Sequence, residues 1–270
     1  NVLSIGLDYL FIVVWQWDVR GAAWATLIAE YVACLSALLA IVLVTKQQGW
    51  RIQRWFEWAS LKASLNLSAD LFVRTLILLF AFNFFNAQSA RLGTDVLAAN
   101  AILFQFTLFV SFFLDGYALA AETLTARAIG ARDTLAFHRA AAVTSVSALG
   151  IAALLSLGFA CLGPAAINLL TSIESVATIA TAHIGWLILI PLASVGAYAL
   201  DGIFIGAGHT RTMRDMMLVS VIFAYLPIWW LFRSWGNHGL WLAFVVFNLS
   251  RGITLAIAYP RIFKGKKGHF

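Results

Sequence analysis

The chain has 270 residues, of which 62% are hydrophobic and 11% are charged, and its formal net charge is +6. Soluble globular domains carry about 25% charged residues, so this composition excludes a water-soluble domain and, with it, a nucleic-acid-binding role for the positive charge. Continuous apolar stretches of about 20 residues or more recur along the chain, which is the length a helix needs to cross a bilayer core. Because these stretches lack the alternation of barrel strands, the sequence predicts an all-α, polytopic bundle of transmembrane helices.

Apolar runs and their breakers predict eight spans, connected mostly by short turns. The first run begins at Asn1 without an initiating Met or a basic leader, so we expect the chain to be part of a longer protein. Cys34 and Cys161 lie within or beside apolar runs and are interpreted as structural, with no disulfide or metal framework. The predicted spans are 1–15, 22–44, 66–90, 95–126, 137–160, 175–205, 214–233 and 239–260.

The 18 Lys and Arg residues are distributed unevenly over the connections. If successive spans alternate in direction, the connections at 45–62, 127–139 and 209–214 and the tail from 261 share one side, which carries thirteen cations; the other side carries three, and two lie inside spans. By the positive-inside rule, the thirteen-cation side is cytoplasmic and includes the C-terminus. This predicts a multi-pass protein of the inner, or plasma, membrane.

The connection between the second and third spans divides two helices from six. It mixes Trp50, Trp55 and Trp58 with Arg51 and Arg54, as helices in the lipid headgroup region do, although a plain basic loop is an alternative. The predicted organisation is therefore two transmembrane helices at 1–44, an amphipathic cytoplasmic linker at 45–65, six transmembrane helices at 66–260 and a basic cytoplasmic tail at 261–270.

Ionisable residues inside the spans are informative, because a charge at mid-membrane costs about 2.5–3.5 kcal/mol even on lenient scales. Asp70 and Arg74 are four residues apart with the acid first, so they are predicted to pair on one helix face. Two interpretations stay open: a pair that breaks when an ion or substrate arrives, or a permanent structural pair.

The span 95–126 carries a polar stripe. Asn100, Thr107, Ser111, Asp115 and Glu122 share a narrow arc of an ideal helix with 100° per residue. Lipid would not tolerate such a stripe, so we expect it to face other helices or a water-filled cavity. Asp115 is interpreted as functional and Glu122 as structural.

The span 175–205 is predicted to carry a second polar face formed by His183, Ser194, Tyr198 and Asp201, with Pro191 bending the helix. Glycines at positions 202 and 206 form a GxxxG pattern, which indicates tight helix packing.

Arg251 in the last span, with Asn248 three residues before it, offers a counter-charge to one of the buried acids and is interpreted as structural. The sequence contains no Walker A loop, no HExxH, no zinc-type Cys/His spacing and no nucleophile elbow. We therefore predict no enzyme activity, no cofactor and no dedicated metal centre.

Several segments are more specific than their composition. They are ARLGTDVLAANAIL at 90–103, LDGYALAAE at 114–122, IGARD at 129–133, LDGIFIGA at 200–207 and GNHGLW at 236–241, together with Asp70 and the Arg74-Thr75-Leu76 segment. These segments resemble the DinF-like branch of the MATE (multidrug and toxic compound extrusion) family. The resemblance extends from about 66 to 260, and GAAWAT at 21–26 resembles the end of the family's first half.

The resemblance implies a twelve-helix antiporter with two six-helix lobes around a central cavity. In this chain it implies the last two helices of the first lobe and a complete second lobe, in a protein that is monomeric in the lipid bilayer. Such proteins export amphipathic or cationic compounds in exchange for H⁺ or Na⁺. The implied substrate and ion pathway candidates are Asp70, Arg74, Asn100, Ser111, Asp115, Tyr198, Asp201 and Arg251.

The coupling ion is left open by the resemblance. In DinF-like relatives the acid best linked to protons lies on the first helix, which we expect this sequence not to include. NorM-like relatives use acids on the helices where Asp70 and Asp201 lie, so Na⁺ at Asp70 or Asp201 is one option. Two alternatives remain: a flippase of lipid-linked precursors, which would need cavity cations for phosphate, and a membrane scaffold without transport.

Overall fold

The computed structural model describes residues 2–47 and 58–264 and divides the chain into two compact units, Asn1–Leu61 and Lys62–Phe270. The described residues form helices and no strand, as predicted. Trp50 and Trp55 of the predicted linker lie outside the described ranges. Within those ranges, seven helical segments are long and apolar enough to cross a membrane: Asp18–Leu43, Ser64–Arg91, Thr94–Gly130, Thr134–Leu170, Ile184–Gly206, Thr210–Trp235 and Asn237–Ala258.

The first unit is a helical hairpin. It contains α1 (Val2–Asp8), a π-helical turn η1 (Tyr9–Val14) and α2 (Asp18–Gln47). The predicted span 1–15 is represented by a shorter apolar segment, Leu3–Val14. At the turn, the Phe11 ring stacks on Trp15 and Trp17 with centroid distances of 5.1 and 5.5 Å. These rings hold the start of α2 against η1.

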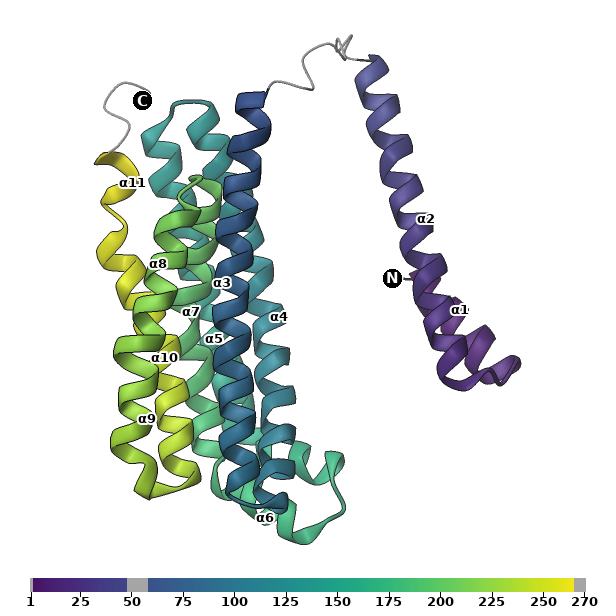
Figure 1. The fold of residues 1–270 in the computed structure, drawn as a ribbon, viewed down its shortest axis with the longest axis vertical. Coiled ribbons are helices and arrows are strands. Elements are labelled where there is room, and N and C mark those ends of the chain that lie inside the picture. The colour runs from purple at the N-terminus through teal and green to yellow at the C-terminus, as the bar shows by residue number, and fades with distance from the viewer. Residues whose placement is uncertain (1, 48–57, 265–270) are drawn as a thin grey trace. The chain divides into compact units, whose positions relative to one another are not determined.

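The second unit contains the other six candidate spans and is drawn from blue to yellow in Figure 1. Long helices that follow one another in the sequence run antiparallel, because short turns join them. The elements are α3 (Trp58–Arg91), α4 (Thr94–Gly130), α5 (Thr134–Leu170), α6 (Glu174–Ala182), α7 (Ile184–Gly206), α8 (Thr210–Ser220), the π-helical η3 (Val221–Tyr225), α9 (Leu226–Phe232), the 3₁₀ turn η4 (Arg233–Trp235), α10 (Asn237–Ala258) and α11 (Arg261–Lys264).

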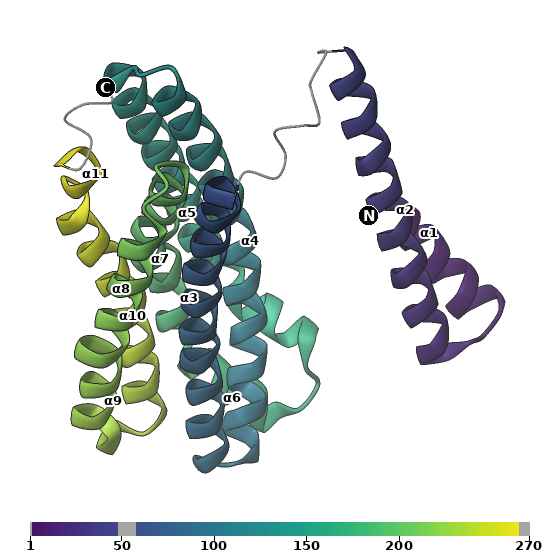
Figure 2. The ribbon, with the colours of Figure 1, turned by 45° about the horizontal axis from the view of Figure 1, so that its top comes forward.

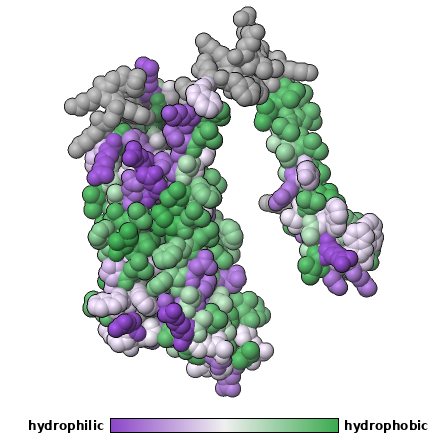
Figure 3. All heavy atoms as spheres, viewed as in Figure 1, coloured by the Kyte–Doolittle hydropathy of each residue, from purple (hydrophilic) through white to green (hydrophobic). Residues whose placement is uncertain are grey.

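The two ends of the second unit differ in their connections. The start of α3, the α4–α5 and α7–α8 turns and α11 lie at one end, whereas the α3–α4 turn, α6 and the α9–α10 turn lie at the other (Figures 1 and 2). The cation-rich connections after α4 and α7 therefore share one end, as the alternating topology predicts. Figure 3 shows an apolar surface around the middle of this unit, with hydrophilic residues toward its ends.

The segment 175–205 differs from its prediction, because it forms two helices instead of one. The helix breaks at His183, between α6 and α7, and α7 continues through Pro191. About 20 residues suffice to cross the hydrocarbon core, and α7 alone has 23 residues. The residues before Ile184 are therefore not needed to cross the core, and they form the separate helix α6.

Candidate functional site

The centre of the second unit is α7, which packs against α4, α5 and α10. Two glycines allow α4 to approach closely. A Cβ on Gly202 would lie 2.1 Å from the carbonyl oxygen of Ala118, and a Cβ on Gly206 would lie 2.2 Å from Oγ1 of Thr125. The tight packing predicted from the GxxxG pattern is thus confirmed, and it brings the polar residues of α7 beside the polar stripe of α4.

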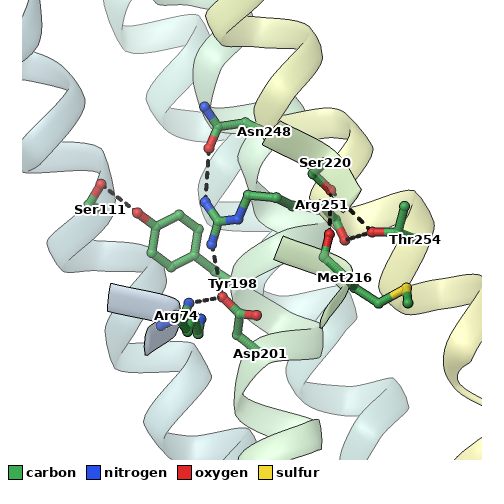
Figure 4. Close-up of polar contacts among 9 residues, drawn as sticks. All are labelled: Arg74, Ser111, Tyr198, Asp201, Met216, Ser220, Asn248, Arg251 and Thr254. Carbon is green, nitrogen blue, oxygen red and sulfur yellow. Dashed lines mark hydrogen bonds and ion pairs between the residues drawn. The ribbon is translucent and has the colours of Figure 1, made fainter. Parts of the chain in front are cut away.

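Asp201 on α7 is the centre of a charged cluster (Figure 4). Its side chain is buried, and its Oδ2 accepts hydrogen bonds from two guanidinium groups. Arg251 on α10 donates through Nη2 at 2.9 Å, and Arg74 on α3 forms the second ion pair. Arg251 is only 3% exposed and also donates to Oδ1 of Asn248 at 3.2 Å. The cluster therefore connects three helices and contains two cations for one anion.

Tyr198 extends this cluster to α4. Its hydroxyl donates a hydrogen bond to Oγ of Ser111 at 2.8 Å, and its ring lies 5.7 Å from the guanidinium carbon of Arg251. Phe247 presents a second ring to Arg251 at 5.6 Å. Cation–π contacts of a desolvated guanidinium are worth up to about 2 kcal/mol. Five of the eight predicted pathway residues, namely Arg74, Ser111, Tyr198, Asp201 and Arg251, therefore meet in one place.

The predicted ion pair between Asp70 and Arg74 is wrong. Arg74 binds Asp201, and Asp70 accepts a hydrogen bond from Nη1 of Arg214 on α8 at 2.5 Å. Arg214 also contacts Asp215 at 2.7 Å. The two charged side chains of α3 point toward α7 and α8. Each therefore pairs with a charge on the neighbouring helix and not with the other, one turn away on α3. Sequence reasoning missed Arg214 because it was assigned to a connection, although the structure places it within α8.

Asp115 on α4 follows Ser111 by one helical turn but is exposed. Within the described part of the chain, it forms no hydrogen bond or ion pair. It lies close enough for electrostatic interactions with Arg74, Asp201 and Arg251. Asp115 is thus a carboxylate near the cluster that has no ion-pair partner among the described residues.

Asn100 lies apart from the cluster and is fully engaged by other groups of the protein. Its amide donates to Ser89 at 2.8 Å and to Asn237 at 2.7 Å, and its carbonyl oxygen accepts from Asn237 at 3.0 Å and from Trp241 at 2.9 Å. The polar stripe of α4 therefore contributes to two separate sets of contacts: Asn100 to the hydrogen bonds with Asn237 and Trp241, and Ser111 to the Asp201 cluster through Tyr198. Asn237 and Trp241 lie in the segment GNHGLW at 236–241, whose sequence pattern does not by itself assign them to a site.

His183 also lies apart from Asp201, since the helix break separates it from the polar face of α7. Its ring stacks on His238 with a centroid distance of 4.2 Å, and its Nδ1 lies 2.8 Å from the carbonyl oxygen of Ile179. Burial lowers the pKa of His183, and the nearby His238 lowers it further, against the opposing effect of the Ile179 hydrogen bond. Trp186 donates a hydrogen bond to Nδ1 of His238 at 3.0 Å.

Among the residues that the structure describes, no three His, Cys, Asp or Glu side chains lie close enough together to hold a metal ion. The two acids suggested for Na⁺, Asp70 and Asp201, each have a guanidinium partner. The charge of each of these two carboxylates is already neutralised by a guanidinium group, so each attracts a further cation less strongly than Asp115 does.

Comparison with known families gives a direct match. A model of the MatE family matches residues 71–230, which is more than half of the chain. This chain belongs to the MATE family. The predicted resemblance to a family of multi-pass membrane transporters is therefore confirmed.

Curated MATE relatives extend this result. The chain is 36% identical to DNA damage-inducible protein F of Escherichia coli over 97% of its own length and 57% of the relative, which confirms the DinF-like assignment. It is 27% identical to Protein DETOXIFICATION 43 of Arabidopsis thaliana over 94% of its own length and 48% of that protein. The chain thus spans about half the length of these relatives.

Solved MATE structures share the fold. The Vibrio cholerae MATE transporter VcmN in its bent form matches with a TM-score of 0.84 and 22% identity, over 100% of this chain and 61% of that one. An outward-facing multidrug resistance MATE family transporter matches with a TM-score of 0.82 and 21% identity, over 97% of this chain and 60% of that one. The unit Lys62–Phe270 contains six of the seven candidate spans found among the described residues, and the assignment of this unit to a second lobe stays a prediction.

Proposed function

We propose that the protein containing this chain is a secondary active exporter, not an enzyme, which exchanges H⁺ or Na⁺ for amphipathic or cationic compounds. Membership of the MATE family supports transport, and one solved relative is described as a multidrug resistance transporter. The proposal includes action as a monomer in the inner membrane, with the thirteen-cation side and the C-terminus in the cytoplasm. That orientation is supported by the positive-inside rule.

The observation that carries the proposal is the charged cluster within the candidate spans. Asp201 and Arg251 are 5% and 3% exposed, and both lie in helices long enough to cross a membrane. Charges at that depth are expensive and are retained mainly where ions or substrates pass or where they hold an interface. The cluster lies near Asp115, a carboxylate with no ion-pair partner among the described residues, which favours the first role.

Asp115 is the acid that we assign to cation binding. Asp201 already faces two guanidinium groups, so a third positive charge there would be repelled. Asp115 is exposed and has no partner among the described residues, and it is one helical turn from Ser111, which is connected to the cluster through Tyr198. A proton, Na⁺ or a cationic substrate can therefore neutralise Asp115 without displacing an existing ion pair.

Exchange follows if the cation and the substrate prefer different states of the protein. A ligand shifts a conformational equilibrium only by the difference between its affinities for the two states. Neutralising Asp115 changes the charge beside Arg74 and Arg251, which interact with it electrostatically. Since Arg74 is on α3 and Arg251 is on α10, the state of Asp115 is coupled to how these helices are held together.

The test uses the intact protein in proteoliposomes loaded with a fluorescent cationic dye. Imposed H⁺ and Na⁺ gradients are compared, and Asp115→Asn is compared with Glu122→Gln, its neighbour two turns along the same helix. We expect gradient-driven dye efflux that Asp115→Asn reduces at least tenfold and Glu122→Gln leaves nearly unchanged, since one lost ionic contact is worth about 1.4 kcal/mol or more.

Two results would contradict the proposal. Efflux that is insensitive to both gradients would exclude cation coupling. Full activity of Asp115→Asn would exclude this acid as the cation site. Translocation of a labelled lipid-linked precursor without dye efflux would favour a flippase instead, although two cations within the candidate spans, Arg74 and Arg251, are already bound to Asp201.

A further inference from the structure

The helix α3 is attached to the second lobe differently along its two halves. In its second half, Ala81, Phe85 and Ser89 are fully buried, and the Phe85 ring lies 4.9 Å from the ring of Trp241. In its first half, none of the described side chains between 64 and 76 is buried. Aromatic packing therefore anchors one half. The other half is held by the partly buried Leu71 and by its two charged side chains, of which Asp70 also accepts a hydrogen bond from Thr210 at 3.4 Å.

Arg74 and Asp70, the charged side chains of the first half, each bind a residue of the lobe that is also paired with a second residue of the lobe. Arg74 binds Asp201, which is also bound by Arg251 at 2.9 Å. Asp70 binds Arg214 at 2.5 Å, and Arg214 also contacts Asp215 at 2.7 Å. Without α3, the lobe would therefore keep two complete pairs, Asp201 with Arg251 and Arg214 with Asp215.

The charges of α3 also complement each other. Asp70 and Arg74 are four residues apart on one helix, with the acid N-terminal to the base, which is the favourable spacing and order for a pair within a helix. They do not use this pairing in the present structure. Each of the three pairs, namely Asp70 with Arg74, Asp201 with Arg251 and Arg214 with Asp215, is thus neutral by itself.

We propose that the first half of α3 docks onto and separates from the second lobe by exchanging ion-pair partners. In the docked state, Arg74 binds Asp201 and Asp70 binds Arg214, as observed. In the released state, Asp70 binds Arg74, Asp201 keeps Arg251, and Arg214 keeps Asp215. No charge loses all of its partners in either state, so the exchange avoids the large cost of an unpaired charge within a membrane.

The sequence of α3 determines the form of this movement. The helix contains neither Gly nor Pro between 58 and 91, so it has no built-in kink site. It therefore tilts as a rod about its anchored aromatic half, and its first half moves most. Release exposes the side of Asp201 that Arg74 covers. The proposal is independent of the proposed coupling at Asp115, because it concerns only the pairing of α3.

Single and double substitutions distinguish exchange from a static clamp. Under exchange, Asp70→Asn leaves Arg74 alone in the released state, and Arg74→Gln leaves Asp70 alone there, so each single variant favours docking. In the double variant Asp70→Asn/Arg74→Gln, α3 has lost both of these charges, so neither is left unpaired in the released state. The released state is therefore populated again. A static clamp predicts the opposite sign, because each substitution removes a docked contact and the two losses accumulate.

The measurement is the distance distribution between spin labels in the intact protein in lipid nanodiscs. The exposed residues Cys34 and Cys161 are first replaced by Ala, and labels are placed at the exposed positions Leu65 on α3 and Leu218 on α8. A control pair moves the α3 label to Leu79, in the anchored half. Arg74→Lys serves as the charge-preserving variant.

We expect two distance populations for Leu65 and Leu218 in the unsubstituted protein and in Arg74→Lys. The longer population should fall several-fold in each single neutral variant and return in the double variant, while the Leu79 distances stay unchanged. A single population in the unsubstituted protein would overturn the proposal. An increase of the longer population in the single variants, greatest in the double variant, would also overturn it, because it would show that the ion pairs only clamp α3.

Discussion

The contact between α4 and α7 gives the most direct test of the packing that builds the site. In Gly202→Ala, the new Cβ would lie 2.1 Å from the carbonyl oxygen of Ala118 and 2.7 Å from its carbonyl carbon. Both atoms belong to the backbone, so no side-chain rotation can relieve the overlap. The two helices must separate by about 1 Å to restore an ordinary contact distance.

The expected cost follows from two opposing effects. Overpacking of a close interface costs about 1–3 kcal/mol, and the backbone clash puts Gly202→Ala at the upper end of that range. Ala is more favourable than Gly inside a helix by about 1 kcal/mol. We therefore expect a net loss of about 1–2 kcal/mol in the free energy of unfolding for Gly202→Ala.

The matched control is Gly116→Ala on α4, where a new Cβ would meet no atom within 4 Å. This variant should gain the helical preference without the clash, so the two variants should differ by about 2–3 kcal/mol. The assay is unfolding of the purified intact protein in detergent, followed by thermal melting and by titration with a denaturing detergent. Equal stability of the two variants would refute the close α4–α7 contact and the position of Asp201 that depends on it.

Two further predictions concern charge. Asp201→Asn leaves Arg251, which is 3% exposed, without a carboxylate and should cost about 3–5 kcal/mol in the free energy of unfolding. Asp201→Asn/Arg251→Gln should recover part of that loss in the same melting assay, and a double variant less stable than the single one would argue against the pair. For His183, the folded-state pKa lies below the usual 6.5, so its contribution to stability is present above that value and is lost as the pH falls below it through the folded-state pKa. His183→Gln should therefore flatten the fall of the unfolding midpoint between about pH 8 and pH 5, and an unchanged slope would contradict this.

Much of the fold could be predicted from the sequence, because the signals are local. Hydrophobic run length predicts the spans, and the distribution of cations predicts which connections share one end of the second lobe. The sequence also predicts that Ser111 faces other helices or a water-filled cavity, and that Tyr198 and Asp201 share one polar helix face. Lipid exposure of such groups is too costly for them to lie elsewhere, so their environment follows from their sequence position.

The partners of these groups could not be predicted in the same way. Asp70 and Arg74 have the spacing of a pair within one helix, yet each binds a residue on another helix. Asn100 shares the stripe of Asp115 but is engaged by Asn237 and Trp241 near the start of α10. Helical spacing specifies only the direction in which a side chain points.

The sequence by itself determined that this chain is a membrane bundle with a one-sided charge distribution and costly polar groups in its spans. Only the tertiary structure decided that Arg74 and Arg251 share Asp201, that Asp115 is left without a partner among the described residues, and that α7 begins at Ile184. The physical reason is that ion pairs form between the charges that helix packing brings within a few ångströms. Here that packing depends on the contact of Gly202 with the backbone of α4.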